Sequence, residues 1–126
     1  MSFATDLLTL MTADSAINTA VENRIYFENL EDNYDITKTW IVYSFKKISQ
    51  QDTLTLNNAF TTYTVYVRCI STSTVSLNAL GDLIQSYLNG KNQGGIQDIT
   101  FVYDTHSFDL EKGQYSILLE FEAIYL

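Results

Sequence analysis

The feature that most constrains this chain is a regular alternation of apolar and polar side chains in two segments, residues 60–69 and 114–125. Successive side chains of a β-strand point to opposite faces of the sheet, so this alternation is typical of strands that bury one face. The side chains expected on the buried face are Tyr63, Val65, Val67, Cys69, Tyr115, Ile117, Leu119, Phe121, Ala123 and Tyr125. The other face would carry a mixed set that includes Thr62, Thr64, Tyr66, Arg68, Leu118, Glu120, Glu122 and Ile124.

Three further segments have the composition of strands. Residues 39–48 and 96–103 are rich in β-branched and aromatic side chains, and residues 24–27 (RIYF) form a shorter run of the same kind. The 39–48 segment is apolar on both faces, with Trp40 and Val42 on one side and Ile41, Tyr43 and Phe45 on the other. A strand that is apolar on both faces needs cover on both faces, which a helix and a neighbouring subunit would supply.

Two helices are expected. Leucines and other apolar residues recur at helical spacing over residues 74–89, after the candidate N-caps Ser71 to Ser73 and before Gly90, which suits the position after a helix. Ser2 is a candidate cap for an N-terminal helix, and a short helical turn would follow a second cap at Asp14 or Ser15.

The predicted architecture is an α+β two-layer sandwich formed by one domain, residues 1–126. A mainly antiparallel sheet of about four strands would pack against one long helix and the N-terminal helix, in the order α-β-β-β-α-β-β. Polar connections are expected at 28–35, where four acidic residues occur, at 49–59, and at 104–113.

Charge excludes one class of function. Fifteen acidic residues against seven basic ones give a formal charge of −8, whereas a protein that binds duplex DNA as its main task needs a basic patch. The first fifteen residues lack the basic start of a signal peptide, and no apolar run is long enough to span a membrane. No membrane association is therefore expected.

No group of residues has the pattern of a catalytic or metal site. His106 and Ser107 are adjacent and would point to opposite faces of a strand, and Cys69 is expected on a buried face, where a thiol is unreactive. The single cysteine excludes an intramolecular disulfide, and no calcium loop or phosphate-binding glycine motif occurs. We therefore expect a protein that is not an enzyme and has no metal or cofactor.

The mixed outer face of the sheet is the remaining unusual feature. A combination of polar and aromatic side chains is what a subunit interface needs when the monomer must also stay soluble, although an ordinary half-exposed sheet has a similar composition. At this point the residues indicate an α+β domain with interaction surfaces.

The order of segments also resembles the tail-completion proteins, or tail terminators, of long-tailed bacteriophages. The resemblance covers nearly the whole chain and is carried by Arg24-Ile25-Tyr26, by Ile41-Val42-Tyr43, and by the strand and helix from Tyr63 to Gly90. Prolines that this family often has before its second strand are replaced here by residues 32–39, which contain none.

The resemblance implies a structural virion protein rather than an enzyme. Such a protein would form a ring, of six copies, at the head-proximal end of the tail tube, end polymerisation of the tube, and provide a docking surface for the head connector or stopper. It would be assembled in the cytoplasm of the host bacterium, and phage DNA would pass through the ring without sequence-specific binding. An acidic channel would repel the DNA backbone.

The resemblance also implies where contacts would lie. The candidate channel-facing residues are Glu120, Glu122 and Arg68. The candidate contacts to neighbouring subunits, tube or connector are Trp40, Val42, Tyr66, Gln50, Gln51, Asp52, Leu54, Leu56, Glu28, Glu31 and Asp32. Two alternatives remain open: a head-side adaptor between head and tail, and a small ligand-binding or enzymatic α+β domain with a pocket near His106.

Overall fold

The computed structural model describes residues 2–30, 34–52 and 59–126. It contains three helices: α1 (Phe3–Ala13), α2 (Ser15–Val21) and α3 (Thr74–Leu88). Its five strands are β1 (Ile25–Phe27), β2 (Trp40–Asp52), β3 (Ala59–Ser71), β4 (Ile96–Asp109) and β5 (Gln114–Tyr125). No described helix has the length and hydropathy needed to cross a membrane.

The strands form one sheet in the order β1-β2-β3-β5-β4. Strand β1 is parallel to β2, and all the other neighbours are antiparallel. The α+β class and the hairpin-helix-hairpin order are confirmed, but the sheet is mixed and has five strands rather than about four. The fifth is the short RIYF segment, which joins the edge of the sheet by pairing in parallel with Ile41–Tyr43.

The predicted element order is wrong in a second respect, because the helical turn after Asp14 is a helix of its own. The Asp14 carboxylate accepts a hydrogen bond from the Ile17 amide at 3.0 Å and so caps α2. The caps expected for the other helices are confirmed: Ser2 accepts from the Thr5 amide, and Ser73 accepts from the Ser76 amide. Each side chain satisfies an amide that the first helical turn leaves without an internal partner.

Strand β4 is longer than its sequence pattern predicts. Residues 104–109, expected in a turn, continue β4 because each faces a partner in β5, from Asp104 opposite Leu119 to Asp109 opposite Gln114. The turn is reduced to 110–113, where Gly113 has a φ of +65°. Pairing with a neighbouring strand has therefore overridden a polar local sequence.

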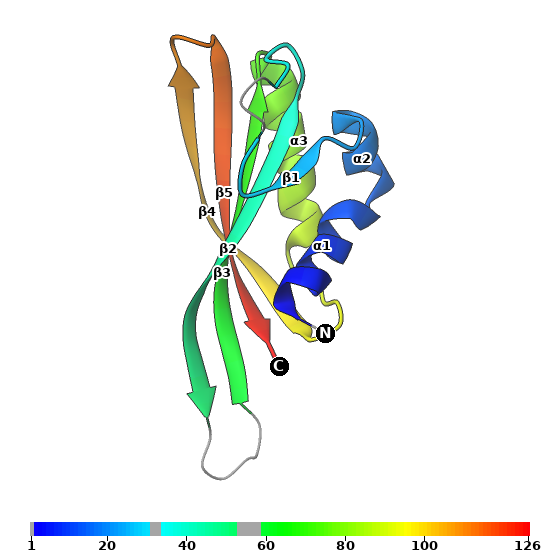
Figure 1. Cartoon of the computed structure of the whole chain (residues 1–126), viewed down its shortest axis with the longest axis vertical. Coiled ribbons are helices and arrows are strands. Elements are labelled where there is room, and N and C mark those ends of the chain that lie inside the picture. The colour runs from blue at the N-terminus through cyan, green and yellow to red at the C-terminus, as the bar shows by residue number, and fades with distance from the viewer. Residues whose placement is uncertain (1, 31–33, 53–58) are drawn as a thin grey trace.

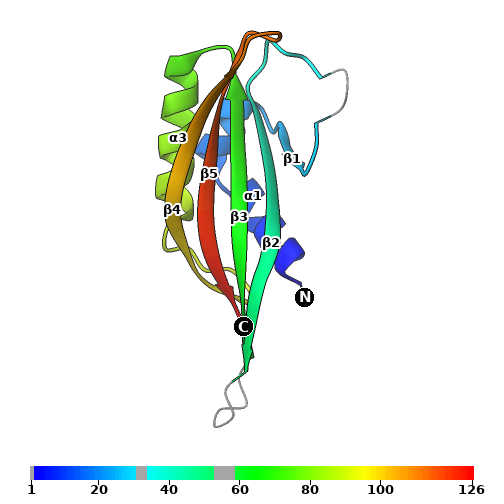
Figure 2. The same cartoon turned by 90° about the vertical axis from the view of Figure 1, so that its left-hand side faces the viewer.

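All three helices pack on one face of the sheet and leave the other face without helices (Figures 1 and 2). The expected buried face is confirmed, since Val65, Val67, Cys69, Leu119 and Phe121 are all almost completely buried. They pack against the apolar stripe of α3, whose buried members are Leu77, Leu80, Ile84 and Leu88. We call the helix-free side the outer face.

Three contacts hold the helices against the sheet. In the middle of α3, Gly81 packs over Ile117 of β5: a Cβ at Gly81 would lie 3.4 Å from the Ile117 Cδ1 atom, in ordinary van der Waals contact. At the start of α1, the Phe3 ring stacks on Tyr63 with a centroid distance of 3.9 Å. The buried Asp6 carboxylate accepts from the Gly95 amide at 3.0 Å, which ties α1 to the start of β4.

Candidate interaction surfaces

Three of the predicted contact residues and one predicted channel-facing residue, Arg68, meet in a hollow on the outer face. Strand register places Val42 opposite Arg68 and Arg68 opposite Leu118, and the next pair along the strands is Ser44 and Tyr66. Glu28, just after β1, lines the same hollow. This outer-face hollow contains Glu28, Val42, Ser44, Tyr66, Arg68 and Leu118.

Glu28 reaches the hollow because the backbone turns sharply after β1. Its φ is +67°, a left-handed conformation that non-glycine residues rarely adopt, and its amide donates to the Tyr43 carbonyl at 2.8 Å. Arg68 is exposed, and no carboxylate lies within ion-pair distance of it among the residues that the structure describes. The hollow therefore presents a guanidinium and a tyrosine ring beside apolar side chains.

The two predicted channel glutamates follow directly along β5. Glu120 lies between Tyr66 of β3 and Tyr103 of β4, and its carboxylate accepts from the Tyr103 hydroxyl at 3.1 Å. That hydrogen bond, together with the negative charge of Glu120, raises the pKa of Tyr103. Glu122 is exposed, so the outer face carries two carboxylates in line along one strand.

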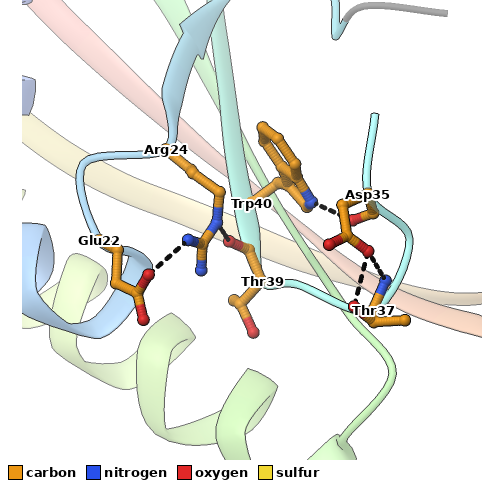
Figure 3. Close-up of polar contacts among 6 residues, drawn as sticks. All are labelled: Glu22, Arg24, Asp35, Thr37, Thr39 and Trp40. Carbon is orange, nitrogen blue, oxygen red and sulfur yellow. Dashed lines mark hydrogen bonds and ion pairs between the residues drawn. The ribbon is translucent and has the colours of Figure 1, made fainter. Parts of the chain in front are cut away.

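Trp40 is covered by its own chain (Figure 3). The Arg24 guanidinium lies 5.6 Å from the centre of the Trp40 ring, and its Nε donates to the Thr39 carbonyl at 2.9 Å. The indole N–H donates to the Asp35 carbonyl at 2.8 Å. Trp40 therefore needs no neighbouring subunit to cover it. Val42, which lies on the same face of this segment, is only half-buried.

A tight turn holds the carbonyl that receives the Trp40 hydrogen bond. The Asp35 carboxylate accepts from the Thr37 hydroxyl at 2.6 Å and from the Thr37 amide at 2.9 Å (Figure 3). Both hydrogen bonds stabilise the ionised carboxylate, so they hold the pKa of Asp35 below its ordinary value.

The sequence interpretation missed a buried glutamine that contacts the residues on both sides of Asp35. Gln114 is only 4% exposed; its side-chain oxygen accepts from the Tyr34 hydroxyl at 2.7 Å, and its amide donates to the Ile36 carbonyl at 3.3 Å. We call these contacts the Gln114 clasp. It fastens residues 34–36 over the β4–β5 hairpin, and no sequence pattern distinguishes Gln114 from an ordinary outward-facing residue.

The β2–β3 hairpin extends beyond the rest of the sheet (Figure 1). Pairing of β3 with β5 ends at Thr61 and Tyr125, whereas pairing of β2 with β3 continues to Asp52 and Ala59. The predicted contact residues Gln50, Gln51 and Asp52 therefore lie in a strand rather than in a connecting loop. Leu54, Leu56, Glu31 and Asp32 lie outside the described residues.

The residues considered for chemistry do not form a site. His106 lies in β4, with its ring 3.2 Å from the Asp104 carboxylate, while Ser107 bonds Ser116 on the opposite face. Cys69 is buried, and burial raises the pKa of its thiol to about 12. Within the described ranges, no cluster of three or more histidine, cysteine and acidic side chains could hold a metal ion.

Comparisons with known proteins agree with this geometry. A family model described as "Tail completion protein gp17" matches residues 5–126. No curated protein matches the sequence. Among solved structures, a chain from "Virion of native gene transfer agent (GTA) particle" superposes with a TM-score of 0.77 at 13% identity, covering 98% of this chain and 94% of that one. At that identity the superposition shows the fold, and the family match shows the relationship: the chain belongs to the gp17 family of tail-completion proteins, which are structural proteins of phage tails.

Proposed function

We propose that this chain forms a closed ring of six copies at the head-proximal end of the tail tube. The ring ends growth of the tube and provides the surface on which the head connector or stopper docks. Assembly takes place in the cytoplasm of the host bacterium. Family membership supports a role in tail completion, and no cofactor or catalytic step is part of the proposal.

The observation that carries this proposal is the uncovered outer face. Helices cover only one side of the sheet (Figure 2), yet the other side holds an arginine, tyrosines and half-buried apolar residues as well as Glu120 and Glu122. In the ring, this face approaches the channel, and its two carboxylates repel the phosphates of the passing DNA.

The protruding β2–β3 hairpin supports an axial contact. It extends past the end of β5, so it can reach a protein above or below the ring without disturbing the core. We assign this hairpin, including Gln50, Gln51 and Asp52, to contact with the tube or the connector.

Native mass and tube binding test the proposal together. Light scattering after size exclusion measures the mass of the full chain alone, and co-sedimentation measures its binding to purified tail tubes. We expect a species of six times 14.4 kDa, alone or at the tube end, and tubes that stop elongating when the chain is added. A monomer that ignores tubes but binds filled heads would instead support the head-side adaptor, and a monomer that binds neither would contradict both roles.

A further inference from the structure

An apolar hollow of about 340 Å³ lies between α2, α3 and the start of β2. We call it the α2–α3 hollow, and its lining residues are Ala20, Thr39, Ser76, Ala79, Leu80 and Leu83. Leu80 belongs to the core, but Ala20 and Ala79 are exposed and Leu83 is only half-buried. The hollow therefore leaves apolar surface in solvent and is large enough to receive an aliphatic side chain.

The apolar surface of the hollow continues along α3. Val75, Ala79 and Leu83 are four positions apart, so their side chains are neighbours on one side of the helix. Val75 is 79% exposed. The side of α3 that packs on the sheet is a different one, which includes Leu77 and Ile84. Helix α3 thus carries a second apolar stripe that the core of a single chain does not bury.

The turn of the β4–β5 hairpin holds an apolar side chain in solvent. Leu110 is 86% exposed, more than any other large apolar side chain among the described residues. Local hydrogen bonds fix the turn around it. The Asp109 carboxylate accepts from the Glu111 and Lys112 amides at 3.0 and 3.2 Å, and the Asp109 carbonyl accepts from the Gly113 amide at 2.8 Å. A leucine presented on an ordered turn loses little conformational freedom when it is buried by a partner.

The hollow and the leucine lie at the same end of the molecule, on opposite flanks. Strand register places one row of residues across this end of the sheet: Trp40, Ile70, Ser116 and Ser107. Thr39 of the hollow directly precedes the first member of this row, and Leu110 follows three positions after the last. Figure 1 shows the β4–β5 hairpin and α2 on opposite sides of this end, with the start of α3 between them.

The two flanks also differ in charge. Strand β4 contains three aspartates and no lysine or arginine. Beside the hollow, Lys38 is exposed next to Thr39, whereas Arg24 is paired with Glu22. Opposite charge on the two flanks favours the orientation in which the hairpin of one copy approaches the hollow of another.

We propose that Leu110 of one copy of this chain inserts into the α2–α3 hollow of the next copy. Two copies placed side by side in the same orientation bring the hairpin flank of one against the hollow flank of the other. Each copy then inserts a leucine into one neighbour and receives one from the other neighbour, which is a heterologous contact that repeats until the rotation closes. This contact deepens the proposed ring and rests on it.

Burial of apolar surface carries the contact. The leucine leaves water and meets Ala79, Leu80 and Leu83, and exposed Val75 extends the apolar surface beside it. Glu111, the next residue of the turn, stays at the solvent-exposed rim, where a charge contributes little to affinity.

A charge at the inserted position tests the contact. We expect Leu110→Asp to associate about tenfold or more weakly than the wild type, by light scattering alone and by co-sedimentation with tail tubes, because an aspartate would be desolvated in the hollow. Its far-ultraviolet circular dichroism should not change, since Leu110 is exposed in the single chain. Leu126→Asp makes the same change at an exposed leucine at the other end of the sheet and is the matched control. A Leu110→Asp variant that forms rings as readily as Leu126→Asp would overturn the inference.

A second variant separates apolar insertion from charge attraction. Glu111→Lys reverses the charge beside the leucine and keeps the leucine itself, so we expect association to change by about threefold or less. A loss as large as that of Leu110→Asp would show that the charge of the turn, not Leu110, makes the contact, and would contradict the inference.

A cross-link locates the contact independently of these affinities. Leu110→Cys and Ala79→Cys are placed in separate chains, co-expressed and oxidised, with tail tubes present. We expect a linked dimer on a non-reducing gel, because insertion brings the two positions within disulfide range. The control pairs Leu110→Cys with Asn78→Cys, which lines a different hollow, between α3 and β4, and should give no link. Cys69 does not interfere, being buried.

The outcomes separate this inference from the ring itself. Rings in the wild type without the cross-link at position 79 overturn the insertion and leave the ring standing. A wild type that is monomeric both alone and with tail tubes, and variants that do not cross-link, overturn both.

Discussion

At the junction of α1 and β4, the backbone conformation and the packing restrict which residue can occupy position 94. Gly94 has a φ of +54°, and the Asp6 carboxylate occupies the space in which a Cβ would lie. Asp6 itself is buried, and its carboxylate accepts a hydrogen bond from the Gly95 amide. Both the left-handed backbone and the packing of Asp6 therefore favour glycine at position 94.

A matched pair of glycines separates these two requirements. Gly90 also has a positive φ, +81°, but nothing lies within 4 Å of its would-be Cβ. Gly90→Ala should therefore lower the free energy of unfolding by about 1–2 kcal/mol, which is the cost of a left-handed backbone conformation for a residue with a Cβ. Gly94→Ala should lower the free energy of unfolding by about 1–3 kcal/mol more, because the Asp6 carboxylate must leave its hydrogen bond to the Gly95 amide. Urea unfolding measures both, and equal losses would show that Asp6 moves aside without penalty.

At the scale of elements, residues 34–36 of the connection between β1 and β2 are held by two sets of contacts. In the first, Trp40 packs against Arg24 and donates to the Asp35 carbonyl. In the second, the Gln114 clasp fixes Tyr34 and Ile36 to the β4–β5 hairpin. A segment from one edge of the sheet is therefore tied to a hairpin from the other edge.

Replacing the clasp should loosen this connection without unfolding the sheet. Gln114→Leu keeps the side-chain volume but leaves the Tyr34 hydroxyl and the Ile36 carbonyl without their partner. We expect the free energy of unfolding to fall by about 1–3 kcal/mol. Because Trp40 is the only tryptophan, its fluorescence should shift to longer wavelength as the segment moves away. The control is Gln97→Leu, at an exposed position of β4. Identical spectra and melting temperatures for the two variants would contradict a structural role for the clasp.

At the scale of the whole molecule, charge and helix placement give the two faces of the sheet different properties. Helices cover one face, while the other carries Glu120 and Glu122 in a protein whose net charge is −8. Six copies in the proposed ring would concentrate these carboxylates around one channel.

Charge reversal on the outer face should affect DNA passage rather than assembly. Glu120→Lys with Glu122→Lys places cations where DNA would pass, so we expect rings and tails to form but phage titre to fall, because phosphates bind the channel wall. Asp82→Lys with Glu111→Lys makes the same change in net charge at exposed positions on α3 and in the β4–β5 turn. Normal rings, tails and titre in the Glu120 and Glu122 variant would refute their assignment to the channel.

Much of this fold could be predicted because its strongest signals are local. The alternation at 60–69 and 114–125 identified the buried face of two central strands, and the apolar stripe with its caps identified α3. These patterns arise because burial of one face imposes the strand period of two or the helical period of about 3.6 on the residues themselves.

What the sequence could not provide depends on pairing between distant segments. Residues 104–109 have no strand pattern of their own and are extended because β5 pairs with them. Cover for Trp40 comes from Arg24 and Asp35, and the buried Gln114 is hydrogen-bonded to Tyr34, eighty positions away. By itself, the sequence determined which face of each central strand is buried; tertiary structure decided which edges and polar groups found partners, because hydrogen bonds across the sheet join residues that no local period connects.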